Sequence, residues 1–508
     1  MANAATSFLD DHLAAGAGDR VAITTPTESA TYRQLHAMAN RAGHALRALG
    51  IEPEQRVALL LPDGLAWAAT FFGALRIGAV AVPLNTRLRP ADWVAMLADS
   101  RARVLVADES WLGELQSHLK ELPHLKAVVS SGESGAAPRL GDLLAREPAE
   151  LAPEPVSGDD MALWLYTSGT TGGPKAAIHV HRSLLAARHY GIDVLKATEE
   201  DRVLATSRLF FAYALGNALL IPLLVGAQTY LDPAWPEPHA IAARAATFAP
   251  TLMFSVPTFY ARMLRADLPR DTFRSVRACV SAGERLPPEI YTAWRDRFGV
   301  EILDGLGATE TIFMVLANAP GRSRPGATRV PVPGTEARLL DGEGRLVPDG
   351  ASGVLHVRTS SACAGYWNRI DLTRRVFNGE WLRTGDVLTR DAEGYYHHLG
   401  REDDFFKVAG LWVTPGELEA VFLTHPEIVE AGVVGAQDAG GLVKPFAFVV
   451  PRDRKSSTRL VEELTSLAAA RLPAHQRPRR IVVVEDLPRT PTGKLQRFAL
   501  RARAERLT

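Results

Sequence analysis

A string of hydroxyl groups, glycines and one lysine, from Tyr166 to Lys175, is the stretch of this sequence best suited to chemistry. It reads YTSGTTGGPK and follows an apolar run at 161–165 that we predict to be a strand. Glycines let backbone N–H groups approach a ligand closely, and hydroxyls and a lysine add further donors, so the loop suits a polyphosphate. It is not a Walker A loop, because Pro174 precedes Lys175 and Ala176 follows it. On its own, such a string is also compatible with a surface turn.

Two more polar motifs follow predicted strands further along the chain. SAGE spans 281–284 at the end of a strand at 278–281, and DGLGATE spans 304–310 after a strand at 301–303. Ligands of open α/β sheets gather at the carboxyl ends of strands, so both motifs lie where that rule puts a site. Three further blocks, WLRTGD, GREDDFFKVAG and PRTPTGK, end at residues 386, 410 and 494.

The elements that must position these motifs alternate regularly in the first part of the chain. Apolar periodicity predicts helices at 31–50, 65–77 and 91–99 and strands at 57–61, 79–83, 104–106, 127–129 and 251–256. This order predicts a multidomain α/β fold with parallel strands. Short apolar runs between Gly and Asp turns predict a small β-rich subdomain at 336–399.

The last hundred or so residues predict a separate, compact α+β domain. Thr414 and Glu417 have capping-box spacing, with Pro415 at the first helical position. The remaining predicted elements are strands at 428–434, 446–450 and 481–484 and a helix near 460–472. We therefore predict a large N-terminal domain at 1–402 and a small, mobile C-terminal domain at 403–508.

Composition excludes several classes of protein. The 508 residues are 47% hydrophobic and 22% charged, and 57 Lys and Arg balance 57 Asp and Glu, so we expect a soluble globular protein without a nucleic-acid or membrane partner. Two cysteines, Cys279 and Cys363, exclude a disulfide framework and indicate no metal cluster. The N-terminus has early acids and no signal-peptide pattern, and the most apolar run, 214–227, is too short to span a bilayer. A cytoplasmic location is the natural expectation.

Five of these blocks, in this order, resemble the adenylate-forming superfamily of acyl-CoA synthetases, adenylation domains and luciferases: YTSGTTGGPK, GLGATE, WLRTGD, GREDDFFKVAG and PRTPTGK. The resemblance covers nearly the whole chain. It implies that a carboxylate attacks the α-phosphate of ATP to give an acyl-adenylate and pyrophosphate, after which a thiol, usually that of coenzyme A, displaces AMP. It also implies that Mg²⁺ assists the first step and that the small C-terminal domain rotates between the two.

The resemblance assigns roles position by position. Glu310 and Thr167 would hold Mg²⁺, Thr309 would donate to the α-phosphate, and Lys494 would be carried onto the carboxylate and the α-phosphate by the C-terminal domain. Asp386 would accept both ribose hydroxyls. The whole ATP and AMP site would comprise Thr167, Ser168, Gly169, Thr170, Thr171, Gly172, Lys175, Ser281, Ala282, Gly283, Glu284, Asp304, Gly305, Leu306, Thr309, Asp386, Arg401 and Lys494. Asp403 would be the hinge, and the CoA tunnel would be lined by Lys407, Val408, Ala409 and Gly410.

The acid is indicated by SRLFFAYALGN at 207–217, which resembles the corresponding stretch of benzoate-CoA ligases. That similarity implies an acyl pocket bordered by Phe211, Ala212, Tyr213, Ala282, Leu306, Gly307, Phe313 and Met314. Aromatic and small residues with little charge describe a flat, apolar slot for an aryl ring. Benzoate-CoA ligases commonly have a His-Ile pair where this chain has Phe313 and Met314, so a substituted benzoate or a cyclic or heteroaromatic acid stays open beside benzoate.

Our interpretation is an ATP-dependent aryl-carboxylate CoA ligase. The alternatives are a stand-alone enzyme that loads an aryl acid onto a carrier protein, a ligase for a cyclic or short-chain acid, and a non-catalytic adenylate-binding protein. The expected partners are an aromatic carboxylic acid, ATP and CoA, with a second copy of the chain and a lysine acyltransferase acting on Lys494 as further candidates.

Overall fold

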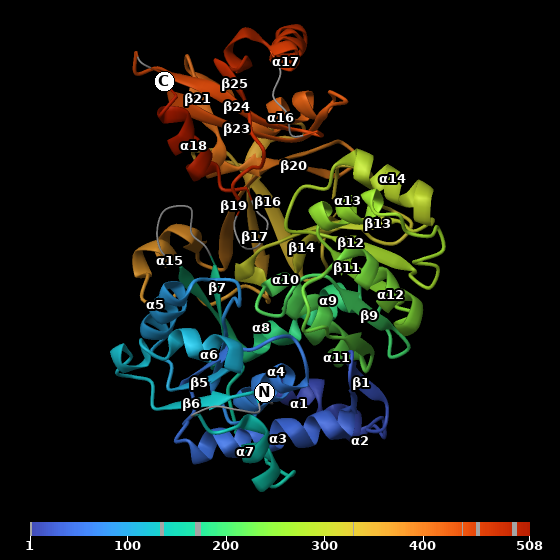
Figure 1. The fold of residues 1–508 in the computed structure, drawn as a ribbon, viewed down its shortest axis with the longest axis vertical. Coiled ribbons are helices and arrows are strands. Elements are labelled where there is room, and N and C mark those ends of the chain that lie inside the picture. The colour runs from blue at the N-terminus through green and yellow to red at the C-terminus, as the bar shows by residue number, and fades with distance from the viewer. Residues whose placement is uncertain are drawn as a thin grey trace. The chain divides into compact units, whose positions relative to one another are not determined.

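A computed structural model describes residues 3–132, 137–167, 174–328, 330–438, 440–453, 458–489 and 495–507, without the side chain of Trp412. The chain forms two compact units (Figure 1). The first comprises Met1–Ala337 and Val357–Leu382, and the second comprises Arg338–His356 and Arg383–Thr508. Residues 338–356 and 383–402 therefore pack with the second unit, although we predicted a domain boundary at 402 from the sequence.

A six-stranded sheet forms one half of the first unit. Its order is β6 (Ala127–Ser130), β5 (Val104–Ala107), β3 (Arg56–Leu60), β4 (Val80–Pro83), β7 (Met161–Thr167) and β8 (Lys175–Val180). All pairs are parallel except β7–β8, which forms an antiparallel hairpin. The predicted strands at 57–61, 79–83, 104–106, 127–129 and 161–165 are confirmed within one or two residues.

A nine-stranded sheet forms the other half. Its order is β15 (Val330–Pro331), β14 (Met314–Ala317), β13 (Ile302–Gly307), β12 (Ala278–Ser281), β11 (Leu252–Ser255), β9 (Arg202–Ala205), β10 (Gln228–Tyr230), β1 (Val21–Thr24) and β2 (Ser29–Thr31). The run from β13 to β1 is parallel, and the edges are antiparallel. Strand β13 extends to Gly307, so DGLG belongs to the strand rather than to the loop after it.

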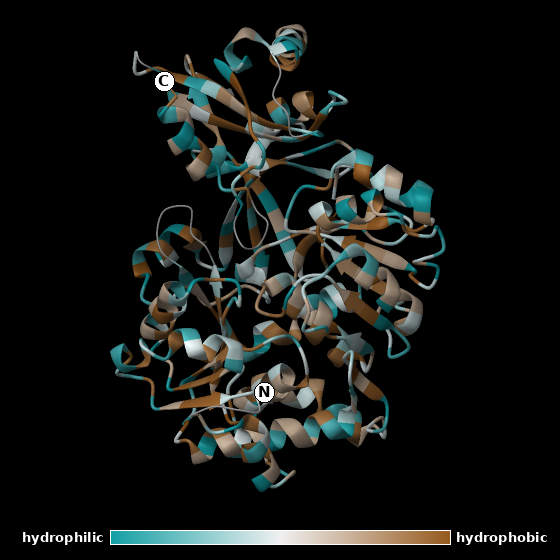
Figure 2. Cartoon of the chain, in the orientation of Figure 1, coloured by the Kyte–Doolittle hydropathy of each residue, from teal (hydrophilic) through white to brown (hydrophobic). Residues whose placement is uncertain are grey.

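Both sheets are buried on both faces, which explains why their strands are almost continuously apolar. In β3, Val57 and Leu59 join the core between the sheets, whereas Ala58 and Leu60 face α5 and α6. In β11, Phe254 joins the same central core, and Met253 faces α12, α13 and α14. Figure 2 shows this as hydrophobic strands flanked by helices of mixed polarity.

The helices of the first unit begin and end close to the predicted positions. The capping box of Thr31 and Gln34 starts α3, which covers most of the predicted helix at 31–50. The helices are α1 (Ala4–Phe8), α2 (Asp10–Ala14), α3 (Tyr32–Ala48), α4 (Leu65–Arg76), α5 (Pro90–Ser100), α6 (Glu109–Leu115), α7 (Leu140–Arg146), α8 (His181–Leu185), α9 (Ala187–Gly191), α10 (Ala212–Ala214), α11 (Ile221–Val225), α12 (Pro238–Phe248), α13 (Pro257–Arg265), α14 (Pro288–Phe298) and α15 (Ile370–Val376). Within the described ranges, no helix has the length and apolar character needed to cross a membrane.

A buried ion pair ties the N-terminal helices to α4. Arg76 is 1% exposed; its guanidinium donates to Asp10 at 2.5 Å and to the Leu151 carbonyl at 2.6 Å. Removing one partner of a buried pair leaves an uncompensated charge, so we expect Asp10→Ala to lower the free energy of unfolding by about 3 kcal/mol. Urea unfolding would measure this, with exposed Asp11→Ala as the control. Equal stability of the two variants would contradict the role of this pair.

The predicted β-rich stretch is confirmed as a five-stranded sheet whose strands run across the boundaries of the two units. It contains β16 (Thr335–Leu340), β17 (Ser352–Thr359), β18 (Phe377–Asn378), β19 (Trp381–Arg390) and β20 (Tyr396–Arg401). The hairpin of β19 and β20 places Asp386 opposite Arg401.

The rest of the second unit is the predicted α+β domain. Strands β23 (Ile428–Gln437), β24 (Val443–Pro451) and β25 (Arg480–Val483) form a sheet. Helices α16 (Pro415–Leu423) and α17 (Thr458–Arg471) cover one face, and α18 (Arg497–Glu505) covers the other (Figure 1). The predicted capping box at Thr414 is wrong: Pro415 does start α16, but the Thr414 side chain makes no capping bond, and the side chain of Glu417 accepts from Gln476.

Candidate active site

Strands β7 and β8, which flank the glycine-rich stretch, pair as an antiparallel hairpin. Thr167 and Lys175 face each other at its base, so the predicted metal ligand and the predicted phosphate-binding lysine are neighbours. Ser168, Gly169, Thr170, Thr171 and Gly172, which we predicted to bind phosphates, lie outside the described residues.

A segment distant in sequence completes the surroundings of Lys175. Residues 364–367 pair with the edge of β8 through backbone bonds that link Ala364 and Gly365 to Ile178 and Trp367 to Ala176. The N–H of Cys363 donates to the Glu310 carbonyl at 2.7 Å. This segment therefore fastens the ATE turn to the glycine-rich hairpin.

Three side chains meet as a result. The Tyr366 hydroxyl donates to Glu310 Oε1 at 2.6 Å, and Lys175 Nζ lies 3.4 Å from that hydroxyl and 3.8 Å from the same carboxylate oxygen. The ammonium also lies 4.4 Å from the centre of the Tyr366 ring, within cation–π range. Glu310 and Lys175 keep side-chain exposures of 15% and 20%, so a ligand can reach both. The Glu310 carboxylate and the Lys175 ammonium are therefore both available to a ligand at the same place.

A buried histidine positions Thr309. His179 lies in β8 with no exposed surface, and its Nε2 lies 2.9 Å from the Thr309 carbonyl. Burial lowers the pKa of His179 to about 4, so the ring is neutral and Nε2–H is the donor. The Thr309–Thr311 turn (η3) is thereby attached to the same strand that carries Lys175.

The chain then reverses at Ile312 through a strained turn. Ile312 has φ +54° and ψ −53°, and the Phe313 N–H donates to the Thr311 carbonyl at 2.5 Å, which defines a γ-turn with positive φ. The buried Thr311 hydroxyl donates to the Phe313 carbonyl at 3.0 Å and supports this conformation. Strained backbone of this kind is typical of functional sites. Here it lets Glu310 face Lys175 while Phe313 and Met314 enter the core.

Glycines make room for these two side chains. A Cβ on Gly216 would lie 3.0 Å from the Phe313 ring, and one on Gly305 would lie 2.9 Å from Met314 Sδ. A Cβ on Gly307 would lie 2.8 Å from the Phe313 carbonyl oxygen. The backbone turn therefore requires glycine at position 307. This requirement is separate from the role in the acyl pocket that we predicted for Gly307.

The predicted acyl-pocket segment forms α10 and runs into a π-helical turn, Leu215–Leu220. Such turns often occur at functional sites. The Tyr213 hydroxyl lies 3.0 Å from the carbonyls of both Ser255 and Val280, so it is engaged with the ends of β11 and β12. Ala212 is buried, and Phe211 is half-buried. Because its hydroxyl is already hydrogen-bonded, Tyr213 can present its ring to a ligand but not a free hydroxyl group.

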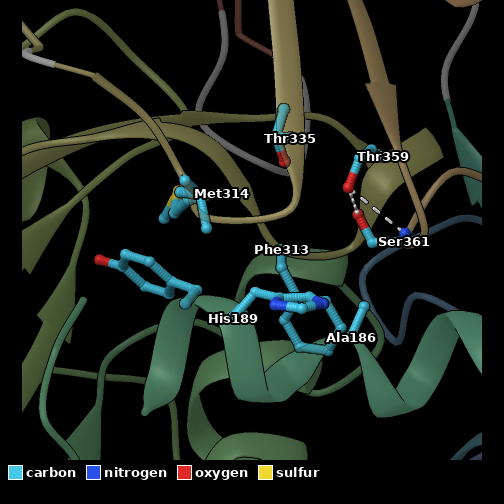
Figure 3. Close-up of a pocket in the computed structure, with 9 residues that line it drawn as sticks. Ala186, His189, Phe313, Met314, Thr335, Thr359 and Ser361 are labelled. Atoms are coloured by element: carbon cyan, nitrogen blue, oxygen red, sulfur yellow. Dashed lines mark hydrogen bonds between the residues drawn. The ribbon is translucent and has the colours of Figure 1, made fainter. Parts of the chain in front are cut away.

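A cavity of about 10 Å³ lies beside Phe313 and Met314 (Figure 3). That is room for about one water molecule. Its wall is completed by apolar groups and by the polar side chains of His189, Tyr190, Thr335, Thr359 and Ser361. Tyr190 was not among the residues predicted from the sequence.

The carboxyl end of β12 and the adjacent part of β13 carry buried polar atoms. Ser281 and Asp304 are paired in register, and Ser281 Oγ and Asp304 Oδ1 have no hydrogen-bond partner among the described residues. Burial raises the pKa of Asp304 well above its ordinary value. Unpaired buried polar groups require an explanation, and a ligand that supplies partners is one. Gly283, with φ +87°, turns the SAGE loop next to this edge.

The residues present fit a magnesium ion bound together with phosphates. Mg²⁺ is commonly held by one or two carboxylates plus substrate phosphates and waters. Glu310 supplies one accessible carboxylate, Thr167 lies at the base of the adjacent hairpin, and no cluster of three or more His, Cys, Asp or Glu suited to a metal occurs among the described residues.

In the second unit, Asp386 is held by two partners. Its carboxylate, 9% exposed, accepts from His398 Nε2 at 3.1 Å and from Arg401 Nη1 at 3.2 Å. Burial alone would raise the pKa of Asp386, but the Arg401 charge and the His398 bond more than offset this and lower it to about 2. Asp386 is thus an ionised acceptor whose hydrogen-bonding geometry is set in advance.

This pKa shift predicts a pH dependence of stability. Because the folded pKa of about 2 lies below the ordinary value of 3.8, ionised Asp386 stabilises the fold above about pH 4, and this contribution is lost as pH falls toward 2. The shift corresponds to about 2 kcal/mol. Urea unfolding of wild type and Asp386→Asn should give free energies whose difference is constant above about pH 5 and shrinks as pH falls from about 4 to 2. A constant difference would contradict the prediction.

The predicted hinge lies in an exposed turn, Glu402–Asp404 (η4). Asp404, directly after Asp403, pairs with Arg497 Nε at 3.2 Å. The Arg497 guanidinium also binds both carboxylate oxygens of Glu419. The residue after Asp403 is therefore anchored to α16 and α18. The hinge role of Asp403 stays a proposal.

The predicted CoA-tunnel residues form a tight hairpin between β21 (Phe406–Val408) and β22 (Leu411–Val413). Its two-residue loop has positive φ at both positions, +48° at Ala409 and +84° at Gly410. A Cβ on Gly410 would meet nothing within 4 Å, so backbone conformation is what favours glycine here. Lys407 is exposed beside this loop.

The structure thus brings together Thr167, Lys175 and Glu310 in one unit and Asp386 with Arg401 in the other. Lys494 lies outside the described residues. Sequence reasoning missed Tyr366, His179, Tyr190 and His398, because each is isolated in sequence from the residue it contacts. The only available signal was a polar residue on an otherwise apolar strand, at His179.

Comparison with known proteins agrees with this geometry. The family model "AMP-binding enzyme" matches residues 10–367, and that of the "AMP-binding enzyme C-terminal domain" matches 417–494. The 4-hydroxybenzoate–CoA/benzoate–CoA ligase of Rhodopseudomonas palustris is 41% identical over 98% of this chain and 94% of its own length. The structure of the anthranilate CoA ligase AuaEII in complex with anthranoyl-AMP has a TM-score of 0.93 at 37% identity, covering 99% of this chain and 98% of its own. A benzoate CoA ligase from Burkholderia xenovorans has a TM-score of 0.90 at 40% identity, covering 99% and 100%.

Proposed function

The chain belongs to the AMP-binding enzyme family, and from that premise we propose that it is an ATP-dependent aryl-carboxylate CoA ligase. It joins an aromatic acid to AMP with release of pyrophosphate and then transfers the acyl group to the thiol of CoA. The relatives with full-length similarity act, by name, on benzoate, hydroxybenzoates and anthranilate.

The observation that carries this proposal is the turn at Ile312. On one side of it, Glu310 lies 3.8 Å from Lys175, where charges on phosphate oxygens need to be neutralised. On the other side, Phe313 and Met314 belong, with Tyr190, to the central hydrophobic core. The reacting carboxylate of an aryl acid lies directly beside its ring, so the two environments have to be this close.

Each proposed step would be carried out by particular residues of this chain. Mg²⁺, bound to Glu310, would withdraw charge from the phosphates. Lys175 and the glycine-rich hairpin would orient the phosphates, and Asp386 would accept the ribose hydroxyls. Lys494 would donate to the attacking carboxylate and the α-phosphate. The roles of Asp403 as hinge and of Lys407, Val408, Ala409 and Gly410 as CoA tunnel belong to the same proposal, as do the boundary at residue 402, a homodimer and acylation of Lys494. We place the enzyme in the cytoplasm, where ATP and CoA are supplied.

The test is formation of AMP and acyl-CoA from ATP, Mg²⁺ and CoA with a panel of acids: benzoate and its hydroxy, amino and halo derivatives, cyclohexanecarboxylate, cinnamate, acetate and octanoate. We expect selective turnover of ring acids. Preference for acetate or octanoate would overturn the aryl assignment. Adenylation without CoA transfer, followed by transfer to a phosphopantetheinyl carrier, would favour the carrier-loading alternative.

A further inference from the structure

Tyr190 lies on α9 beside the 313–314 segment of the predicted acyl pocket. It is 1% exposed, and its side chain shares the cavity wall with Phe313 and Met314. Figure 3 labels these two residues at the cavity. Burial and then the nearby carboxylate of Asp304 raise the pKa of Tyr190, and Tyr190 in turn contributes to the raised pKa of Tyr213. Tyr190 is therefore in the cavity wall of the 313–314 segment and is electrostatically linked to Asp304 and Tyr213, one residue from each of the other two predicted segments.

The hydroxyl of Tyr190 differs from those of its buried neighbours because it has no hydrogen-bond partner within the described ranges. The Tyr32 hydroxyl donates to the Ala227 carbonyl at 2.7 Å, and the Tyr260 hydroxyl donates to the Val280 carbonyl at 2.9 Å. Asp304 Oδ1 is buried and unpaired in the same way. Two unsatisfied buried polar groups cost free energy, which a ligand that bonds to them would recover.

We propose that Tyr190 determines specificity by forming a hydrogen bond with a hydroxyl or amino substituent on the ring of the aromatic acid. The inference rests on the proposed function. A substituent that donates as well as accepts suits this position, because the Tyr190 hydroxyl can itself act as donor or acceptor. A halogen or methyl group cannot donate, and an unsubstituted ring would leave the Tyr190 hydroxyl unpaired. Sites built to bond a substrate hydroxyl reject analogues that lack it much more strongly than apolar pockets do.

The experiment measures kcat/KM for benzoate, the three hydroxybenzoates, the three aminobenzoates and 4-fluorobenzoate. Wild type is compared with Tyr190→Phe, which keeps the ring, and with Tyr260→Phe, which removes a buried hydroxyl outside the pocket. We expect wild type to prefer one hydroxy or amino acid over benzoate by at least about tenfold, and Tyr190→Phe to lower that ratio by a similar factor. Tyr260→Phe should leave the ratio unchanged. Tyr190→Phe should also raise the Tm, because it removes an unpaired buried hydroxyl.

The possible outcomes distinguish failure of the Tyr190 inference from failure of the proposed function. A preference for a hydroxy or amino acid that Tyr190→Phe abolishes would support the inference. The same preference in Tyr190→Phe, or a wild-type preference for benzoate or 4-fluorobenzoate, would overturn the inference and leave the ligase assignment intact. Turnover of no aromatic acid by wild type would overturn the proposed function itself, and the inference with it.

Discussion

Lys494→Ala is expected to lower the rate of acyl-adenylate formation by about 10²–10³ or more, because it removes a cationic donor from the attacking carboxylate and the α-phosphate. The described residues on either side of 490–494 are held in place: Arg489 and Leu495 form an isolated β-bridge, and Arg489 binds Glu430 at 2.7 Å. The neighbouring fold should therefore persist without the lysine. Pyrophosphate exchange measures the first step, and CoA thioester formation from a supplied acyl-adenylate measures the second.

The second step should keep its rate in Lys494→Ala. Lys444→Ala, which changes a lysine on β24 of the same unit, is the control and should leave both steps intact. Equal loss of both steps in Lys494→Ala would refute an adenylation-specific role. Acylation of the same lysine should reproduce the defect, and treatment with a deacylase should reverse it.

Glu310→Gln is the second substitution for which we expect a large loss of adenylation rate. The substitution keeps the shape of the side chain and an oxygen for the Tyr366 hydroxyl, which lies 2.6 Å from the carboxylate, so the turn should stay folded. It removes the charge that would bind Mg²⁺. We expect adenylation to fall by about 10²-fold or more, since loss of one electrostatic contact to the transition state typically costs this much. Calorimetry of ATP binding at increasing Mg²⁺ gives a second readout.

In wild type, Mg²⁺ should strengthen ATP binding, and in Glu310→Gln most of that gain should vanish. Glu301→Gln is a matched control, because Glu301 accepts structural bonds from the N–H of Gly321 and the hydroxyl of Ser323, both at 2.6 Å. Tyr366→Phe should give a smaller loss than Glu310→Gln, because it frees the carboxylate without removing it. An unchanged response to Mg²⁺ in Glu310→Gln would contradict the assignment of Glu310 as the metal ligand.

Local patterns were sufficient for most of the fold. The periodicity of apolar residues predicted α3, α4 and α5, and unbroken apolar runs predicted the central strands, because both depend on burial that each segment must satisfy wherever it packs. The capping box predicted at Thr414 does not form, because a capping bond depends on which other side chains lie nearby and not on burial of the segment alone. A side-chain bond competes with partners from elsewhere, and Gln476 binds Glu417.

The sequence by itself determined the family of the chain, and its ordered motifs predict roles for the glycine-rich stretch, Glu310 and Asp386, since motifs are short and local. Only the tertiary structure decided which side chains orient these groups. Tyr366 reaches Glu310 through pairing of its segment with β8, His179 donates to the Thr309 carbonyl, and Tyr190 on α9 lies beside Phe313 and Met314 of the predicted acyl pocket. No local pattern encodes such contacts, because they arise where segments far apart in sequence are brought together by the packing of two sheets.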